Sequence, residues 1–141
     1  TTLLDLDLKQ YEVYRSHQRV AAEFSSGRVA LAGDAAHLTS TNGGMGLNSG
    51  VQDAAALVTA LLAAIAENST EPITSYASSR KQFCERFLQP TTTANHETVD
   101  NPDQATRAAR LAKLAAQAAD PAQELAAVAK ASMLTDLALQ N

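Results

Sequence analysis

The sequence predicts a mainly helical α/β chain, with two short strands near its front and four helices behind them. Residues that favour strands gather only in the first third of the chain, at 11–17 and 28–32. Farther along, apolar residues recur at helical spacing, and three helix starts are marked by a proline. These observations together favour a few strands attached to a larger helical part.

Composition limits the classes of function. The chain has 141 residues, enough for about one domain, and 45% of them are hydrophobic. A net charge of −4 argues against a surface that binds nucleic-acid phosphates. A single cysteine allows no internal disulfide and fits a reducing, cytoplasmic compartment. No apolar run reaches about 18 residues, so we expect no membrane span.

The two predicted strands differ in kind. Residues Tyr11 to His17 alternate and are rich in β-forming types, as in an antiparallel strand. Residues Arg28 to Ala32 read as a short buried strand that ends at Gly33. Between them we expect a helical turn over Gln18 to Phe24, followed by a tight turn at residues 25–27.

The first predicted helix runs from about Val51 to Ile65. A capping-box pattern of Ser49 and Gln52 marks its start, and residues 68–70 end it. One of its faces is apolar at i, i+3, i+4 and i+7 spacing: Val51, Ala54, Ala55, Val58, Leu61, Leu62 and Ile65.

Proline organises the three later helices. Pro72 suits the first turn of the second helix, and Pro90 should kink or stop that helix near Gln89. Its apolar stripe is formed by Ile73, Tyr76, Phe83 and Phe87.

The third and fourth helices should be capped by Asn101 and Asp120, each followed by proline, with glutamine at the third helical position. The apolar positions of these two helices are Leu111, Leu114, Leu125, Val128 and Leu137. We expect this Ala-rich tail to pack as a helical bundle, although its stripe could bind another chain.

A glycine-rich loop joins the second strand to the first helix. Four of the six glycines, Gly43, Gly44, Gly46 and Gly50, fall within eight positions. A strand, glycine loop and helix in that order present free backbone N–H groups and a positive dipole end to an electron-rich ligand. The first three of these glycines would let a flat or bulky ligand approach the main chain.

Asp34 is the carboxylate at the junction of strand and loop. It suits the hydroxyls of a sugar or sugar alcohol, since it would accept hydrogen bonds from them. Equally, Asp34 could cap a turn at Ala35-Ala36 and have no ligand. His37 is expected to be a structural hydrogen-bonding residue with no metal ligand at suitable spacing. Cys84 is expected to be a small core residue, and His17 and His96 have no partner that the sequence identifies.

Residues 28–57, RVALAGDAAHLTSTNGGMGLNSGVQDAAAL, resemble the second flavin-binding motif of the class A FAD-dependent aromatic monooxygenases. The shared pattern is Arg-Val-x-Leu-x-Gly-Asp-Ala-Ala-His, then Gly-Gly-x-Gly-x-Asn-x-Gly, then Asp-Ala-x-x-Leu. Residues 14–21 are similar to the strand that leads into this motif, and the resemblance covers most of residues 10–95. It implies a C-terminal fragment of a p-hydroxybenzoate-hydroxylase-like FAD-binding fold, mostly helical with two short strands.

The resemblance implies roles for particular residues. The Asp34 carboxylate would bind the ribityl chain of FAD, and the backbone near Leu47 and Asn48 would face the N1 and C2 carbonyl edge of the flavin. The implied cofactor-binding set is Gly33, Asp34, Gly44, Gly46, Leu47 and Asn48, and the resemblance names no catalytic residue. The complete enzyme would hydroxylate a small aromatic or phenolic substrate with NAD(P)H and O2.

Two departures from the family pattern qualify this expectation. Ser40-Thr41-Asn42 stands where the family often has proline before the glycine loop. Nothing in the sequence matches the GxGxxG motif that holds the ADP pyrophosphate, so the chain alone should not catalyse hydroxylation. We therefore expect a partial FAD-binding domain at residues 1–70 and a helical region at 71–141. We also expect the chain to self-associate or to join a missing N-terminal half.

Two other functions stay open on the sequence alone. The chain could be a small helical interaction or regulatory protein that keeps the motif as a scaffold. It could also belong to another flavoenzyme with a Gly-Asp motif, such as a halogenase or a dehydrogenase.

Overall fold

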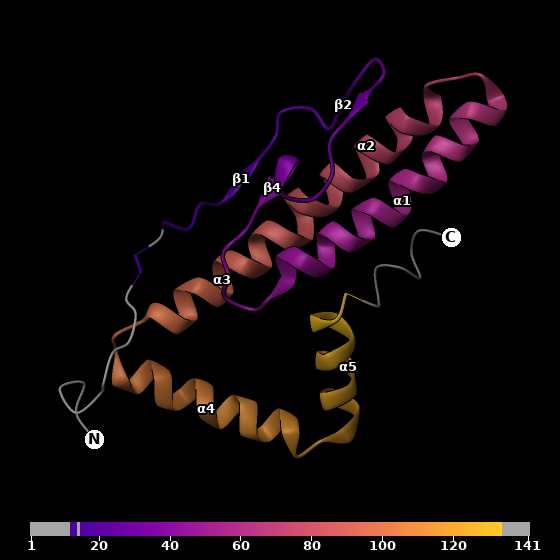
Figure 1. Cartoon of the computed structure of the whole chain (residues 1–141). Coiled ribbons are helices and arrows are strands. Elements are labelled where there is room, and N and C mark those ends of the chain that lie inside the picture. Colours follow the sequence, from indigo (N-terminus) through magenta and orange to yellow (C-terminus); the bar gives the residue numbers. More distant parts are fainter. Residues whose placement is uncertain (1–11, 14, 134–141) are drawn as a thin grey trace.

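The computed structural model describes residues 12–13 and 15–133 and confirms a mostly helical α/β chain (Figure 1). Its strands are β1 (Arg19–Val20), β2 (Ser25–Ser26), β3 (Val29–Ala30) and β4 (His37–Leu38). Its helices are a short 3-10 helix η2 (Gly33–Ala35), α1 (Met45–Glu67), α2 (Glu71–Phe83), a π-helix η3 (Cys84–Leu88), α3 (Gln89–Asp100), α4 (Gln104–Ala118) and α5 (Pro121–Ala131).

The strands form two small antiparallel pairs on one side of the long helices (Figure 1). In the first pair Arg19 is opposite Leu38, which joins β1 to β4. In the second, β2 and β3 form a hairpin whose turn contains Gly27 at φ 58, a conformation that favours glycine.

Three predictions about this region were wrong. The described residues of the expected strand Tyr11 to His17 are not in a strand, because β1 begins only at Arg19, where a partner strand is available. The helical turn expected over Gln18 to Phe24 is absent for the same reason. The partner strand β4 lies in a segment for which the sequence predicts a loop. The strand expected over Arg28 to Ala32 is present but shortened to β3.

Helix α1 starts earlier than expected. Its N-cap is Gly44, in the left-handed conformation at φ 64, and no side chain caps the helix. The capping box of Ser49 and Gln52 is therefore wrong: Ser49 lies inside the helix and is fully buried. The expected end is confirmed, because Asn68 adopts the left-handed conformation at φ 49 that terminates helices.

Helix α1 buries its small and polar side rather than its apolar stripe. Ser49, Asp53 and Ala60 face α2, which runs alongside α1 (Figure 1). An amphipathic helix ordinarily turns its apolar stripe to a core. Here Val58 and Ile65 on that stripe are 56% and 78% exposed. By length and composition alone α1 could cross a bilayer, but its inner face carries a carboxylate held by buried hydrogen bonds.

Helices α2, η3 and α3 follow one another as a continuous rod (Figure 1). The sequence predicts that Pro90 kinks or stops the helix near Gln89, but α3 continues past Pro90 to Asp100. A proline has no backbone N–H, so it cannot donate a hydrogen bond to a carbonyl group of the preceding helical turn. The chain accommodates this by adopting the wider π-helical turn at Cys84–Leu88 directly before Pro90.

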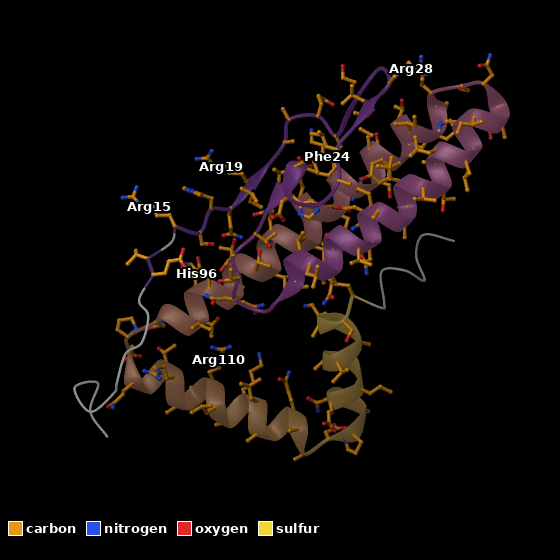
Figure 2. All side chains as sticks on the ribbon, viewed as in Figure 1. Arg15, Arg19, Phe24, Arg28, His96 and Arg110 are labelled. Carbon is orange, nitrogen blue, oxygen red and sulfur yellow. The ribbon has the colours of Figure 1, made fainter. Side chains whose placement is uncertain are left out.

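The core lies between the strands and the α1–α2 pair. Its buried apolar residues are Phe24, Ala36, Met45, Ala60, Tyr76, Ala77, Cys84, Leu88 and Met133. Phe24 reaches the helices from the strand layer, whereas Arg15, Arg19 and Arg28 are exposed on the outer side (Figure 2). Cys84 is completely buried, which confirms its expected place in the core.

The tail joins this core only through Met133, which follows α5, among the described residues of the two tail helices and the turn after them. Helices α4 and α5 contact each other but bury none of their residues, so the expected packed bundle is wrong for the described part of the tail. Leu137 lies outside the described residues.

Asp120 caps α5 as predicted, accepting from the amides of residues 122 and 123. The cap of α4 is Asp103 rather than Asn101, whose side chain instead accepts from the Asp103 amide. The division expected after residue 70 stays a prediction.

Candidate functional site

The turn that follows β3 presents Asp34 to solvent. Gly33 has φ 58, which favours glycine. Its neighbour across the turn is Gly50 of α1: a Cβ on Gly50 would lie 3.5 Å from the Gly33 Cα, so both positions allow turn and helix to approach closely. The Asp34 side chain is exposed, and none of the described residues hydrogen-bonds its carboxylate. Asp34 therefore does not cap the Ala35-Ala36 turn, and its carboxylate is available to a ligand.

The glycine loop shapes the entrance to α1. Gly43 has φ 108, and a Cβ there would lie 2.6 Å from the Asn95 Nδ2 atom. A Cβ on Gly44 would meet no atom within 4 Å, so the space beside that residue is open. The loop thus packs against α3 on one side and leaves the backbone accessible on the other.

The first turn of α1 has no charged or polar cap. Within residues 12–13 and 15–133 no side chain accepts from its amides, and no acidic residue lies in its first turn. Leu47 and Asn48 are exposed in this turn, while a Cβ on Gly46 would approach the Thr39 Oγ1 atom at 3.1 Å. Uncapped N–H groups and the positive end of the helix dipole favour an electron-rich or anionic group here.

Beneath this turn lies a buried cluster centred on Asp53. One carboxylate oxygen, Oδ2, accepts from the Gly33 amide at 2.9 Å and lies 2.6 Å from the His37 Nε2 atom. The other oxygen, Oδ1, accepts from the Arg80 Nε atom at 2.6 Å. Ser49 lies within 3.4 to 3.5 Å of both the Arg80 and His37 side chains. The structural hydrogen bond predicted for His37 is thereby confirmed.

The electrostatics of the cluster keep Asp53 ionised. Burial by itself would raise the pKa of this carboxyl group. Hydrogen bonds from His37, Arg80 and the Gly33 amide, together with the charge of Arg80, outweigh burial and hold the pKa below its usual value. The Arg80 guanidinium also lies 4.3 Å from the centre of the Phe83 ring, which gives the buried cation a second contact.

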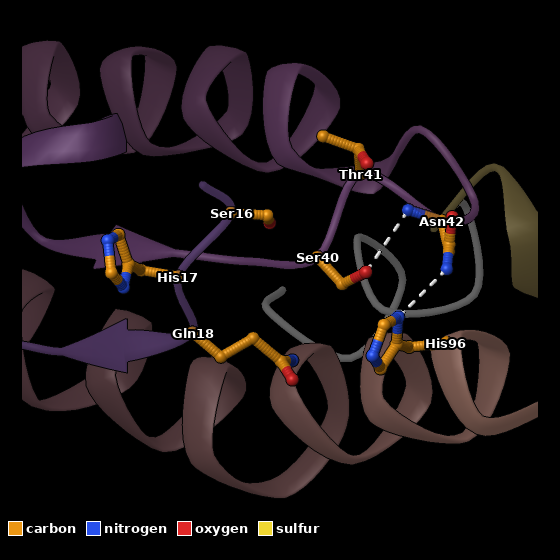
Figure 3. Close-up of a pocket in the computed structure, with 7 residues that line it drawn as sticks. All are labelled: Ser16, His17, Gln18, Ser40, Thr41, Asn42 and His96. Carbon is orange, nitrogen blue, oxygen red and sulfur yellow. Dashed lines mark hydrogen bonds between the residues drawn. The ribbon is translucent and has the colours of Figure 1, made fainter. Parts of the chain in front are cut away.

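A polar pocket of about 350 Å³ lies beside the loop entry (Figure 3). Its lining residues are Ser16, His17, Gln18, Ser40, Thr41, Asn42 and His96. The Asn42 Nδ2 atom lies 3.1 Å from the His96 Nδ1 atom, and the Asn42 amide donates to the Ser40 hydroxyl at 3.3 Å. The structure thus gives His96 a partner that the sequence did not identify, and these contacts tether the loop entry that lacks the family proline.

The sequence-predicted site residues fall on two adjacent elements. Gly33 and Asp34 belong to η2, Gly44 caps α1, and residues 46–48 form the first turn of α1. Helix η2 packs against α1, so the structure brings the two parts together. Sequence reasoning missed the roles of Asp53 and Arg80. The signal that could have revealed Asp53 is a lone carboxylate inside an otherwise apolar helix, which requires a buried partner.

Comparison with known proteins identifies the family of the chain. A family model described as an FAD binding domain matches residues 1–91, which is more than half of the chain. The chain belongs to this FAD-binding family. Its curated relatives are flavin-dependent aromatic monooxygenases, so the class A family that the motif resembles is confirmed, with FAD as the cofactor of the domain.

Three relatives show the range of the match. Para-nitrophenol 4-monooxygenase of Pseudomonas sp. (strain WBC-3) is 48% identical over 67% of this chain and 24% of its own length. The 6-hydroxy-3-succinoylpyridine 3-monooxygenase of Pseudomonas putida (strain DSM 28022 / S16) is 43% identical over 53% of this chain and 20% of its own length. The crystal structure of p-nitrophenol 4-monooxygenase from Pseudomonas putida DLL-E4 matches with a TM-score of 0.62 and 50% identity. It covers 67% of this chain, which spans 24% of that structure. The chain therefore spans about a quarter or less of the length of these relatives.

The residues present fit part of an FAD molecule. The exposed Asp34 carboxylate has no hydrogen-bond partner in the described part of the chain, and it suits the ribityl hydroxyls, which are hydrogen-bond donors. The open space beside Gly44 and the uncapped first turn of α1 suit a flat ring with an electron-rich edge.

Proposed function

We propose that this chain supplies the ribityl-binding and pyrimidine-binding part of the FAD site of a monooxygenase that hydroxylates a small aromatic or phenolic ring. The observation that carries the proposal is that an exposed Asp34 carboxylate, with no hydrogen-bond partner among the described residues, lies across one glycine loop from an uncapped α1 N-terminus. The chemistry that FAD supplies when bound is the transfer of two electrons from NAD(P)H to O2, with one oxygen atom entering the ring and the other leaving as water.

The chain's own residues bind and orient. Gly33, Asp34, Gly44, Gly46, Leu47 and Asn48 are the residues that would contact the cofactor. Asp34 would accept hydrogen bonds from ribityl hydroxyls, while the backbone of residues 46–48 would face the electron-rich edge of the flavin. A helix dipole favours negative charge at its N-terminus, so this turn would stabilise the reduced form of the cofactor.

The names of the relatives support hydroxylation over halogenation or dehydrogenation, since those proteins are described as monooxygenases and hydroxylases. Reduced nicotinamide cofactors are cytoplasmic metabolites, so the proposal also places the protein in the cytoplasm. The choice between a small interaction protein and a flavin-binding part is decided by whether the chain binds FAD at the proposed residues.

Isotope-detected NMR of the 141-residue chain, titrated with FAD, tests this function. We expect shifts confined to Asp34 and residues 44–48, with a dissociation constant in the millimolar range, about −4 kcal/mol, because the proposed residues contact only the ribityl and pyrimidine parts of FAD. Asp34→Ala should weaken binding at least about tenfold, since it removes a charge-assisted acceptor worth about 1.5–3 kcal/mol.

Glu124→Ala provides the control, because Glu124 is an exposed carboxylate on the tail helix α5 and should leave FAD binding unchanged. Shifts scattered over the surface, or none at all, would contradict the flavin function. Stoichiometric sub-micromolar binding would instead show a complete flavin site within this chain, contrary to the partial site proposed.

A further inference from the structure

The Asp53 carboxylate ties together three segments that are distant in the sequence. Its partners are the Gly33 amide in the turn before Asp34, His37 in β4, and Arg80 in α2. Asp53 and Arg80 are 0% and 1% exposed. One buried carboxylate therefore connects the flavin-facing turn to both the strand layer and the second long helix.

These contacts fix the backbone that carries Asp34. The Gly33 N–H is held by Asp53, and the Gly33 carbonyl accepts from the Ala36 amide at 2.8 Å. Both polar groups of the residue before Asp34 are thus engaged. The Asp34 side chain has no contact of its own that would orient it among the described residues. The backbone therefore sets the direction of the Asp34 Cα–Cβ bond, and the hydrogen bond from Gly33 to Asp53 holds that backbone.

The buried polar atoms of the cluster lower the stability that a purely structural cluster would be expected to provide. The His37 Nδ1 and Arg80 Nη1 atoms are buried and have no hydrogen-bond partner among the described residues. Burying a polar atom without a partner is unfavourable, and an apolar replacement of a buried ion pair is often at least as stable. What an apolar cluster could not provide is an acceptor for the Gly33 amide.

We propose that Asp53 is a positioning residue, which holds the Gly33–Asp34 turn so that the Asp34 carboxylate is oriented for the ribityl hydroxyls of FAD. Arg80 and His37 act behind it, by keeping the carboxylate ionised and aimed at the Gly33 amide. This inference rests on the proposed function, because it assigns a purpose to the orientation of Asp34.

The test uses a variant that removes the acceptor while keeping the core filled. In Asp53→Leu/Arg80→Met two apolar side chains replace the ion pair, and we expect a folded chain with an unchanged circular dichroism spectrum. Exchange of the Gly33 amide should become at least about tenfold faster relative to the Leu31 amide, which bonds to Phe24 and reports on the hairpin. Affinity for FAD, measured by NMR titration, should fall at least about tenfold, as for Asp34→Ala.

A double-mutant cycle separates positioning from stability. If Asp53 acts through Asp34, adding Asp34→Ala to the apolar variant should cause no further loss of FAD affinity. Thr92→Val is the matched control: it removes a buried hydroxyl that bonds to Leu88 and Gln18, away from Gly33, and should change neither the relative exchange rate nor the affinity. Where the double variant does not fold, Asp53→Ala/Arg80→Met is measured in the same way, because alanine also leaves the Gly33 amide without an acceptor.

Each result has a definite reading. Unchanged relative exchange of the Gly33 amide, or additive losses in the cycle, would overturn the positioning role. Absence of FAD-induced shifts in the unmodified chain would overturn the proposed function instead, whereas the exchange measurement would still decide whether Asp53 holds the turn.

Discussion

At the residue scale, the distinctive feature is a set of ionisable groups buried between α1 and α2. Asp53 stays charged because three donors surround it. Tyr76 donates to the Leu31 carbonyl at 2.8 Å, and burial, followed by the nearby Asp53 charge, raises its pKa to about 12. The same two causes raise the pKa of the Cys84 thiol to about 12. Burial, with the Asp53 charge added to it, thus keeps both neighbours protonated.

The thiol of Cys84 should be unreactive in the folded protein. Only the thiolate is nucleophilic, and a pKa of about 12 leaves almost none at pH 8. We expect alkylation by iodoacetamide at pH 8 to be negligible in buffer and complete in denaturant, as measured by mass spectrometry. Rapid labelling of the native chain, at a rate independent of denaturant, would contradict the burial of this residue.

Asp53 should make stability depend on pH only in acid. Its pKa in the folded state lies below the unfolded value of about 3.9, so its stabilisation is complete above that value. The stabilisation is lost as pH falls through the lower folded pKa. The difference in unfolding free energy between the unmodified chain and Asp53→Asn should therefore be constant from about pH 8 to 5 and shrink below about pH 4. Urea titrations at several pH values would measure it, and a difference that grows in acid would contradict the assignment.

At the element scale, the conformation of the loop before α1 depends on backbone angles that glycine adopts easily. Gly43 and Gly44 have φ 108 and φ 64. The second value is one that asparagine tolerates, whereas the first is strained for any residue with a side chain. The uncapped start of α1, which carries the proposed flavin contacts, depends on this pair.

Replacing each glycine in turn should show how much backbone strain and the space for a Cβ atom affect stability at the two positions. Gly43→Ala should destabilise the chain by roughly 1–3 kcal/mol, because its Cβ would be strained and would meet the Asn95 side chain at 2.6 Å. Gly44→Asn is the matched control and should be close to neutral in thermal unfolding, since asparagine is tolerated in the left-handed conformation and a Cβ there has open space. Equal melting temperatures for the two variants would show that the loop adapts.

At the scale of the whole molecule, an apolar surface is left uncovered. The exposed stripe of α1 is formed by Leu47, Val51, Val58, Leu61, Leu62 and Ile65. Contiguous exposed apolar surface of this kind usually marks a contact with another protein surface. The relatives are about four times longer than the region shared with this chain, so they contain further structure to which such a face could pack.

The isolated 141-residue chain should therefore self-associate. We expect its average sedimentation coefficient to rise with concentration, because association buries the α1 stripe. The variant Val58→Glu/Leu62→Glu should sediment as a monomer, whereas Leu125→Glu, on the exposed tail helix α5, should behave like the unmodified chain. A chain that remains monomeric at millimolar concentration would contradict this prediction.

The sequence by itself determined the features that depend on neighbouring residues. The glycine pattern placed the loop and Asp34, Asn68 ended α1, and Asp120 capped α5, because each of these signals acts within a few positions. The motif over residues 28–57 was long enough to indicate the family and its cofactor. Other features needed partners that the sequence does not place. Asp53 meets His37, Gly33 and Arg80 across separations of 16, 20 and 27 residues.

Only the tertiary structure could therefore decide which side of α1 is buried. An apolar stripe is identified by spacing, but burial depends on which surface is available to cover it. The Asp53 side of α1 packs on α2 because the ion pair with Arg80 lies there, and the apolar side stays exposed. The pairing of β1 with β4 was hidden for the same reason, since a two-residue strand has no signal apart from its partner.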